Sequence, residues 1–98
     1  MDLEKVVLIE WLESEFGWGI RPDGYSLHLN QDNAENFIED YWNTMPEEVP
    51  NEYSRPCYPA MSVKVTPTLY LKISESENGI RFYNRTFDEY IKSGDIIK

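Results

Sequence analysis

The chain has 98 residues, of which 41% are hydrophobic and 14% are aromatic. That length supports one hydrophobic core but not two, and the apolar content excludes wholesale disorder, so we expect a single domain over residues 1–98. The formal net charge of −9 repels nucleic-acid phosphates and acidic lipid surfaces, which argues against direct binding to either.

The first predicted element is a helix over residues 2–16. Leu8, Leu12 and Phe16 recur every four residues and so fall on one helical face. Gly17 follows directly and is typical of the residue just past a helix C-terminus. The acidic residues between the apolar positions would then face solvent.

Residues 18–29 are predicted to form a β-hairpin. The segment Arg21-Pro-Asp-Gly24 has the composition of a type I turn, with proline second and glycine last. Apolar residues alternate with others on both sides of that turn, at Trp18, Ile20, Tyr25, Leu27 and Leu29. His28 lies between two of them, so we expect it to face solvent or to pack at a rim.

A second helix is predicted to end at Met45. Apolar side chains recur at the spacing of one helical stripe, at Ala34, Phe37, Ile38, Tyr41, Trp42 and Met45. Asn30 or Asp32 can cap its N-terminus, and Pro46 would end it at Met45.

A proline-rich connection spans residues 46–60, where four prolines exclude a helix. We expect a short strand at residues 63–65 after it. Thr66 and Pro67 are typical of a helix start and favour a helix over residues 67–77. The alternation of Leu69, Leu71 and Ile73 instead fits a strand, and we prefer the helix.

The last predicted elements are a strand over residues 80–83 and a short helix over residues 87–93. Thr86 and Glu89 have the spacing of a capping box for that helix, and Gly94 would end it. Together the elements predict an α+β fold. In it, two main amphipathic helices pack on a small antiparallel sheet, with a Pro-rich loop and a short C-terminal helix.

Few residues are suited to catalysis or metal binding. His28 is the only histidine and Cys57 the only cysteine, which excludes an internal disulfide and any zinc site of four cysteines or two histidines. No spacing singles out an acid–base pair of carboxylates, and no phosphate-binding or dinucleotide motif is present. We therefore expect no enzyme, no cofactor and no metal; a small enzyme that uses His28 or Cys57 is the weakest alternative.

Three arginines lie beside aromatic residues in short segments that contain glycine or proline. The arginine fork suits phosphate or carboxylate, and the rings offer stacking faces, so these segments would suit a nucleotide-like ligand. The candidate binding residues are Trp18, Arg21, Tyr25, His28, Tyr53, Arg55 and Arg81. In the alternative interpretation, each arginine pairs with an acid and stacks on its neighbour.

Charge is distributed unevenly along the chain. Residues 1–52 carry thirteen acids and two bases, whereas residues 53–98 carry five acids and seven bases. The first half would attract a basic protein surface through acidic residues, namely Glu10, Glu13, Glu35, Glu39 and Asp40. The alternative interpretation is that these acids only keep the protein soluble. A further alternative is a homo-oligomer in which Arg55, Arg81 and Arg85 of one copy contact the acidic helices of another.

Three segments of the chain, at residues 18–29 (WGIRPDGYSLHL), 52–56 (EYSRP) and 78–81 (NGIR), carry a resemblance. They are similar to a family of small, mostly uncharacterised proteins of phages and other mobile elements. By analogy, such small acidic proteins block host defence by occupying a protein surface or by sequestering a signal molecule. The hypothesis is a non-enzymatic inhibitor that binds a host defence protein through an acidic surface. The alternative is an oligomeric sponge for a nucleotide-derived signal molecule.

The same features predict a location in the cytoplasm of the host cell. The longest apolar run, Val6–Ile9, is too short to span a bilayer. No secretory leader pattern is recognisable at the N-terminus.

Overall fold

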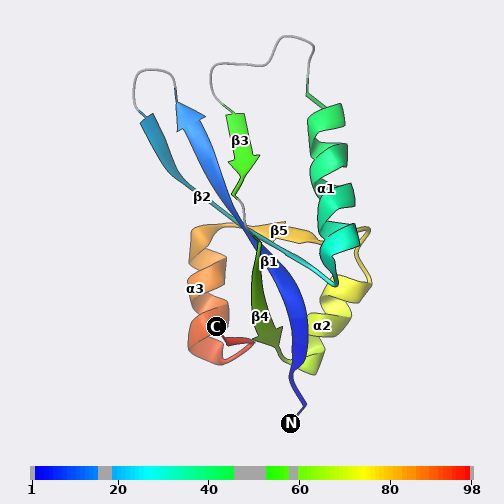
Figure 1. Cartoon of the computed structure of the whole chain (residues 1–98). Helices are drawn as coiled ribbons and strands as arrows, with labels where there is room; N and C mark the ends of the chain where they lie inside the picture. Colours follow the sequence, from blue (N-terminus) through cyan, green and yellow to red (C-terminus); the bar gives the residue numbers. More distant parts are fainter. Residues whose placement is uncertain (1, 16–18, 46–52, 58–59, 98) are drawn as a thin grey trace.

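A computed structural model describes residues 2–15, 19–45, 53–57 and 60–97 of the chain. The described residues form an α+β fold (Figure 1). Its elements in chain order are β1 (Glu4–Glu15), β2 (Gly19–His28), α1 (Gln31–Asn43), β3 (Tyr53–Pro56), β4 (Met61–Val65), α2 (Pro67–Ser74), β5 (Ile80–Phe82), α3 (Asn84–Ser93) and β6 (Ile96–Ile97).

Strand β1 is the centre of an antiparallel sheet that has six strands among the described residues. Five of them follow the order β5-β2-β1-β4-β6, and the sixth, β3, also pairs with β1. Along one edge β1 pairs with β2, and along the other it pairs first with β4 and then with β3. Val6 stands opposite Val63 of β4, and Trp11 stands opposite Pro56 of β3. Two segments far apart in the chain therefore share one edge of the long strand.

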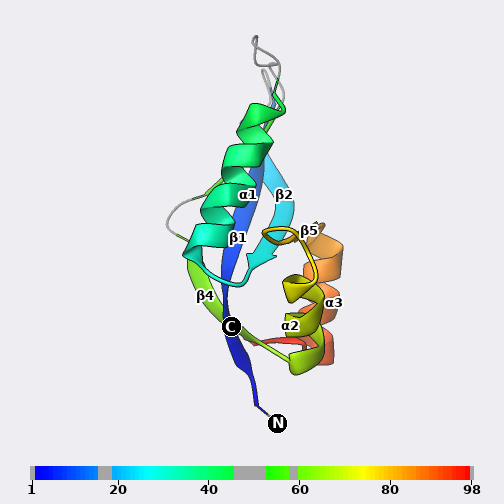
Figure 2. The ribbon, with the colours of Figure 1, turned by 90° about the vertical axis from the view of Figure 1, so that its right-hand side faces the viewer.

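Helices cover both faces of this sheet (Figure 2). Helix α1 packs on one face, where Ile9 and Trp11 of β1 are buried against it. Helices α2 and α3 pack on the other face, where Val6 and Leu8 are buried. The alternation of side chains along β1 thus feeds two cores, one on each face of the sheet.

The predicted helix over residues 2–16 is wrong, because this segment forms β1. The run Val6–Ile9 is apolar at every position since the strand is covered on both faces, and such strands lose the polar–apolar alternation that identifies a strand. Its β-branched residues suit a pleated surface. The four-residue spacing of Leu8 and Leu12 has no helical meaning here. Phe16 and Gly17 lie outside the described residues.

The predicted hairpin turn at residues 21–24 is also wrong, because these residues lie inside β2. Glu10 pairs with Tyr25, and Leu12 pairs with Pro22. Two residues of β2, Asp23 and Gly24, therefore lie opposite a single residue of β1, Trp11. This two-against-one arrangement is a β-bulge, and Gly24 takes its left-handed backbone there, with φ of 90°. The turn-forming residues are used to bend a strand and not to reverse it.

The other elements largely follow the predictions. Asn30 caps α1, its side chain accepting a hydrogen bond from the Asn33 amide at 2.8 Å, and the helix ends at Asn43, two residues before the predicted end. Thr66 caps α2 and Pro67 opens it, which confirms the helix over the strand. Part of the Pro-rich connection forms β3; residues 46–52 and 58–59 lie outside the described residues.

Strand β5 is confirmed, and so is the end of the last helix at Gly94, which has φ of 86°. The start of that helix differs from the prediction. Helix α3 begins at Asn84, and Tyr83 occupies the N-cap position without a side-chain hydrogen bond. Thr86 is therefore inside the helix, and the predicted capping box does not form.

Candidate binding surfaces

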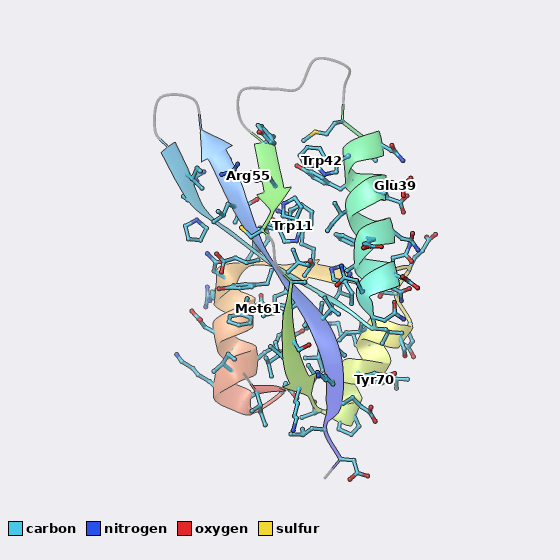
Figure 3. The ribbon with its side chains drawn as sticks, in the orientation of Figure 1. Trp11, Glu39, Trp42, Arg55, Met61 and Tyr70 are labelled. Carbon is cyan, nitrogen blue, oxygen red and sulfur yellow. The ribbon has the colours of Figure 1, made fainter. Side chains whose placement is uncertain are left out.

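Helix α1 carries an exposed acidic face. Four carboxylates share the helix side that points away from the sheet, at Asp32, Glu35, Glu39 and Asp40. Figure 3 shows Glu39 on this outer side, while Trp42 points back towards β3. Ala34 and Ile38, on the opposite side, are buried in the core. The amphipathic pattern of the helix thus places all four acids in solvent.

The local electrostatics of this face are unfavourable beyond the first turn, in which Asp32 lies at the positive end of the helix dipole. Asp32 and Glu35 are three residues apart and Glu35 and Glu39 four, so like charges lie beside each other along the helix. The last turn holds no basic residue, although Asp40 lies close to the negative end of the helix dipole. Within residues 2–15, 19–45, 53–57 and 60–97, none of the four carboxylates forms an ion pair.

The predicted acidic surface is divided between α1 and β1. Glu35, Glu39 and Asp40 lie together on α1, and the structure adds Asp32, which sequence reasoning considered only as a cap. Asn30 takes the capping role, which leaves the Asp32 carboxylate for the surface. Its position three residues before Glu35 was the signal that could have identified it.

The two acids on β1 have other surroundings. Glu13 forms an ion pair with Arg21 on the neighbouring strand, with 2.9 Å between the guanidinium and the carboxylate. Glu10 is half-buried and faces Tyr25 across the strand pair. Neither residue belongs to a helix face, so the exposed acidic surface consists of the four α1 carboxylates.

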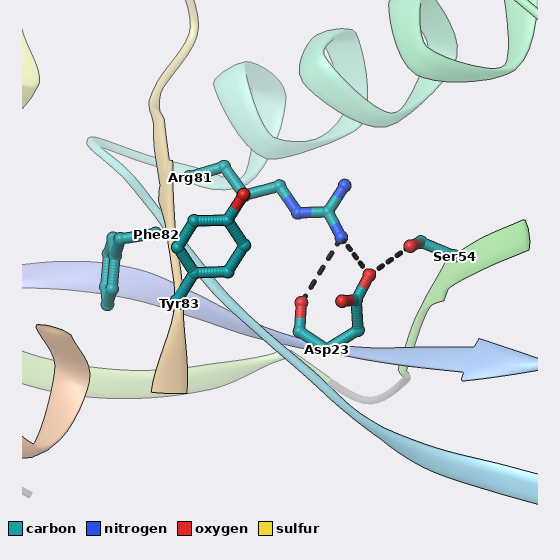
Figure 4. A pocket seen from close by; sticks show the side chains of 5 residues that line it. All are labelled: Asp23, Ser54, Arg81, Phe82 and Tyr83. Carbon is teal, nitrogen blue, oxygen red and sulfur yellow. Dashed lines mark hydrogen bonds and ion pairs between the residues drawn. The ribbon is translucent and has the colours of Figure 1, made fainter. Parts of the chain in front are cut away.

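A second candidate site forms around Arg81 of β5, where three distant segments meet (Figure 4). The Arg81 guanidinium donates through Nη2 to the Asp23 carboxylate at 2.8 Å and to the Asp23 carbonyl at 3.3 Å. The Ser54 hydroxyl of β3 donates to the same carboxylate. The β-bulge in β2 turns Asp23 towards both partners.

Aromatic rings support this cluster from the α1 side. The Arg81 guanidinium carbon lies 4.3 Å from the centre of the Trp11 ring, which is a cation–π geometry. The Tyr41 hydroxyl of α1 donates to the Ser54 carbonyl at 2.5 Å. A hollow of about 370 Å³ opens beside the ion pair, lined in part by Phe82 and Tyr83.

The predicted Arg and aromatic residues do not share one pocket. Tyr25 stacks on Phe87 of α3, with ring centres 3.9 Å apart, on the face of the sheet opposite Trp11 and Arg81. Tyr53 contacts Trp42, Arg55 stands opposite Leu12 on the β1–β3 pair, and Trp18 lies outside the described residues. Arg21 and Arg81 each pair with an acid, which is the ion-pair part of the alternative interpretation.

His28 is fully buried, so the expectation that it faces solvent or a rim is wrong. Its Nδ1 lies 2.6 Å from the Asn78 carbonyl, which can only accept, so Nδ1 carries the proton. The Ser26 hydroxyl donates to Nε2 at 2.8 Å and accepts from the Trp11 indole at 2.7 Å. Burial lowers the pKa of His28, and the Asn78 hydrogen bond partly offsets that effect.

Neither of the two residues considered for catalysis is presented as a reactive group. Ser26 and His28 have the contact of a nucleophile and its base, but both side chains are sealed from solvent. Burial raises the pKa of the Cys57 thiol, Glu10 adds to that effect and Arg55 opposes it, the reverse of an activated thiolate. In the described part of the chain, no hydrogen bond joins Cys57 to His28.

Comparison with known proteins returned no match to this chain from family models, curated proteins or solved structures. The resemblance to phage and mobile-element proteins stays a prediction from the three sequence segments. Among the described residues, no three or more histidine, cysteine or acidic side chains are grouped to hold a metal ion. None of the described helices is both long and apolar enough to cross a membrane.

Proposed function

We propose that this protein is a non-enzymatic binding protein that docks the acidic face of α1 on a basic surface of another protein. The observation that carries the proposal is the exposure of four carboxylates, Asp32, Glu35, Glu39 and Asp40, with no ion-pair partner among the described residues. Such a face raises the local concentration of a basic partner and speeds its approach.

The energetics of α1 support this role over mere solubility. Acids spread over the whole surface would keep the protein soluble without repelling one another. On α1, Glu35 and Glu39 are adjacent like charges and Asp40 lies near the negative end of the dipole, so these three acids destabilise their own helix. Cations from a partner would relieve that repulsion at the moment of binding. The free helix therefore carries a local electrostatic cost that a bound basic partner would remove.

The two alternatives have weaker support. A sponge for a nucleotide-like ligand would need Tyr25 and Arg81 in one pocket, and they lie on opposite faces of the sheet. An enzyme would need His28 or Cys57 to meet a substrate, and His28 is sealed while the thiol has a raised pKa. The resemblance to phage proteins makes a host defence protein the partner class that we propose.

The test compares two pairs of substitutions that change the net charge equally. Glu35→Gln with Glu39→Gln removes charge from the acidic face, and Glu4→Gln with Glu75→Gln removes it from exposed sites elsewhere. We expect immobilised wild-type protein and the control to retain a host protein that the α1 variant loses. For the recovered partner, the dissociation constant should rise roughly tenfold in the α1 variant, mainly through slower association.

The same variants give a stability readout. Removing the like-charge contact should raise the free energy of unfolding of the α1 variant by about 0.5 kcal/mol, while the control should not change. Partner binding should weaken steeply with salt for the wild type and less so for the α1 variant. Equal capture by both variants, or binding insensitive to salt, would contradict the proposal.

A further inference from the structure

The face of the sheet that α1 covers is only half covered. Lys5 of β1, Lys64 of β4 and Ile97 of β6 stand side by side in register across three strands. Their neighbours Val6, Val65 and Ile96 are buried on the α2–α3 side, so alternation places these three residues on the α1 side. All three are exposed, Ile97 to 45%. We call these residues the basic sheet face.

This face is basic in a chain of net charge −9. Lys5 and Lys64 are direct cross-strand partners, and like charges in that position destabilise a sheet. Neither lysine forms an ion pair with any residue that the structure describes. A hollow of about 290 Å³ lies between them, lined also by Ser62, Val63 and Ile97. The surface thus combines unpaired positive charge with an exposed apolar centre.

Helix α1 stands on another part of the same side (Figure 2). Its exposed carboxylates lie on the side of the helix opposite the buried Ala34 and Ile38, and so point away from the sheet. On this side of the sheet, the acidic helix α1 therefore stands above the sheet, beside the uncovered basic sheet face. A second copy, turned over by a two-fold axis that runs parallel to the sheet and above this side of it, would set its α1 above the basic sheet face of the first. The same operation sets the first α1 above the second basic sheet face.

We propose that two copies of this chain form such a symmetric dimer, with the acidic face of each α1 seated on the basic sheet face of the other. Charge complementarity selects this occupant, since Glu35 and Glu39 meet Lys5 and Lys64 twice in one assembly. Reciprocal contacts close the assembly at two copies, as is usual for soluble oligomers. Ile97 supplies the apolar part of each contact.

The test exchanges the charges of one surface at a time and measures mass in solution by sedimentation velocity or light scattering. One variant carries Lys5→Glu and Lys64→Glu, and in the other all four carboxylates of the acidic face are replaced by lysine, at Asp32, Glu35, Glu39 and Asp40. We expect the wild type to be a dimer at low salt that dissociates as salt rises. Each variant alone should be a monomer, because its two surfaces carry the same sign of charge.

An equimolar mixture of the two variants is the decisive sample. In the mixed dimer each helix meets a sheet face of opposite charge, so the mixture should recover a dimer and no larger species. That recovery also shows that both variants fold. A wild type that stays monomeric at low salt, dimers of either variant alone, or a mixture that stays monomeric or forms long chains would overturn the proposal.

This experiment is separate from the test of the proposed function. It uses the purified protein alone, whereas partner capture uses the neutralised α1 variant against a host protein. A monomeric protein that still captures a partner through α1 overturns the dimer only. A protein that dimerises, and that captures no partner even when diluted to the monomer, overturns only the proposed function.

Discussion

Trp11, Ser26 and His28 form a continuous chain of buried hydrogen bonds that begins on β1 and runs along β2. The indole donates to the serine, the serine donates to the imidazole, and the imidazole donates to the Asn78 carbonyl. Each buried polar group therefore has a partner, which removes the cost of burying it. Protonation of Nε2 would break this order, because two donors would then face each other between Ser26 and His28.

This arrangement predicts a pH-dependent stability. The pKa of His28 is lowered in the folded state, so the unfolded chain binds the proton more tightly. The contribution of His28 is therefore complete above its unfolded pKa of about 6.5 and is lost as the pH falls below that value. The free energy of unfolding should drop by at most about 1.4 kcal/mol per pH unit in this window.

Chemical denaturation between about pH 7.5 and about pH 5.5 measures the effect above the ordinary range of carboxylate titration. The control is His28→Gln, which retains hydrogen-bonding atoms but cannot titrate. Its stability should be lower and nearly constant over the same range. A slope as steep in this variant as in the wild type would assign the pH dependence to other groups.

At the scale of elements, the bulge in β2 decides how strands β2 and β5 approach each other. A side chain at Gly24 would place its Cβ 2.3 Å from the Phe82 carbonyl oxygen, a backbone atom that cannot move aside alone. Gly24 also has φ of 90°, which disfavours any residue with a Cβ. The same bulge turns Asp23 towards Arg81, so strand approach and ion pair depend on one backbone distortion.

Two glycine-to-alanine substitutions distinguish the cost of the steric clash with β5 from the cost of a left-handed backbone at a residue with a Cβ. Gly24→Ala should lower the free energy of unfolding by at least about 3 kcal/mol, because the clash adds to the left-handed backbone. Gly19 has φ of 88°, but no atom of the described residues lies within 4 Å of an added Cβ. Gly19→Ala should therefore cost only about 1 kcal/mol, the backbone penalty alone. Equal losses in the two variants would mean that β2 and β5 are not held this closely.

At the scale of the molecule, β1 joins two cores that otherwise lie on opposite faces of the sheet. Leu8 belongs to the core under α2 and α3, and the adjacent Ile9 belongs to the core under α1. A change in either core therefore loosens the strand on which the other is built. We expect the domain to unfold in one cooperative transition, as small single domains usually do.

Leu8→Ala tests this coupling across the sheet. The cavity should cost about 2–5 kcal/mol. In a Trp18→Phe background the remaining tryptophans, Trp11 and Trp42, both lie on the α1 side. We expect Leu8→Ala to shift the unfolding transition followed by their fluorescence and the one followed by far-UV circular dichroism by the same amount, although Leu8 lies on the other face of the sheet. Separate transitions for the two signals would show that the cores unfold independently.

The proposed dimer also has a consequence at this scale. It would cover the acidic face of α1 on both copies, and that is the face the proposed function assigns to a partner. Self-association and partner binding would then compete for one surface. Dissociation of the dimer would be a step of partner recognition.

The helices α1 and α2 and the end of α3 could be predicted from the sequence because their signals are local. A cap such as Asn30, the pair Thr66 and Pro67, and the stop at Gly94 each act within a few residues. The acids at Glu35, Glu39 and Asp40 follow from the same helix, since its apolar stripe determines which side faces solvent. The sequence by itself thus determined most of the acidic surface.

Tertiary structure alone decided β1, the bulge in β2 and the Arg81 cluster. A strand buried on both faces has no alternation to reveal it, and residues 21–24 have the same composition in a turn as in a bulge. Asp23 and Arg81 are 58 residues apart, and only the pairing of β2 with β5 brings them together. Caps depend on neighbours in the chain, whereas strand pairing depends on partners that no short segment contains.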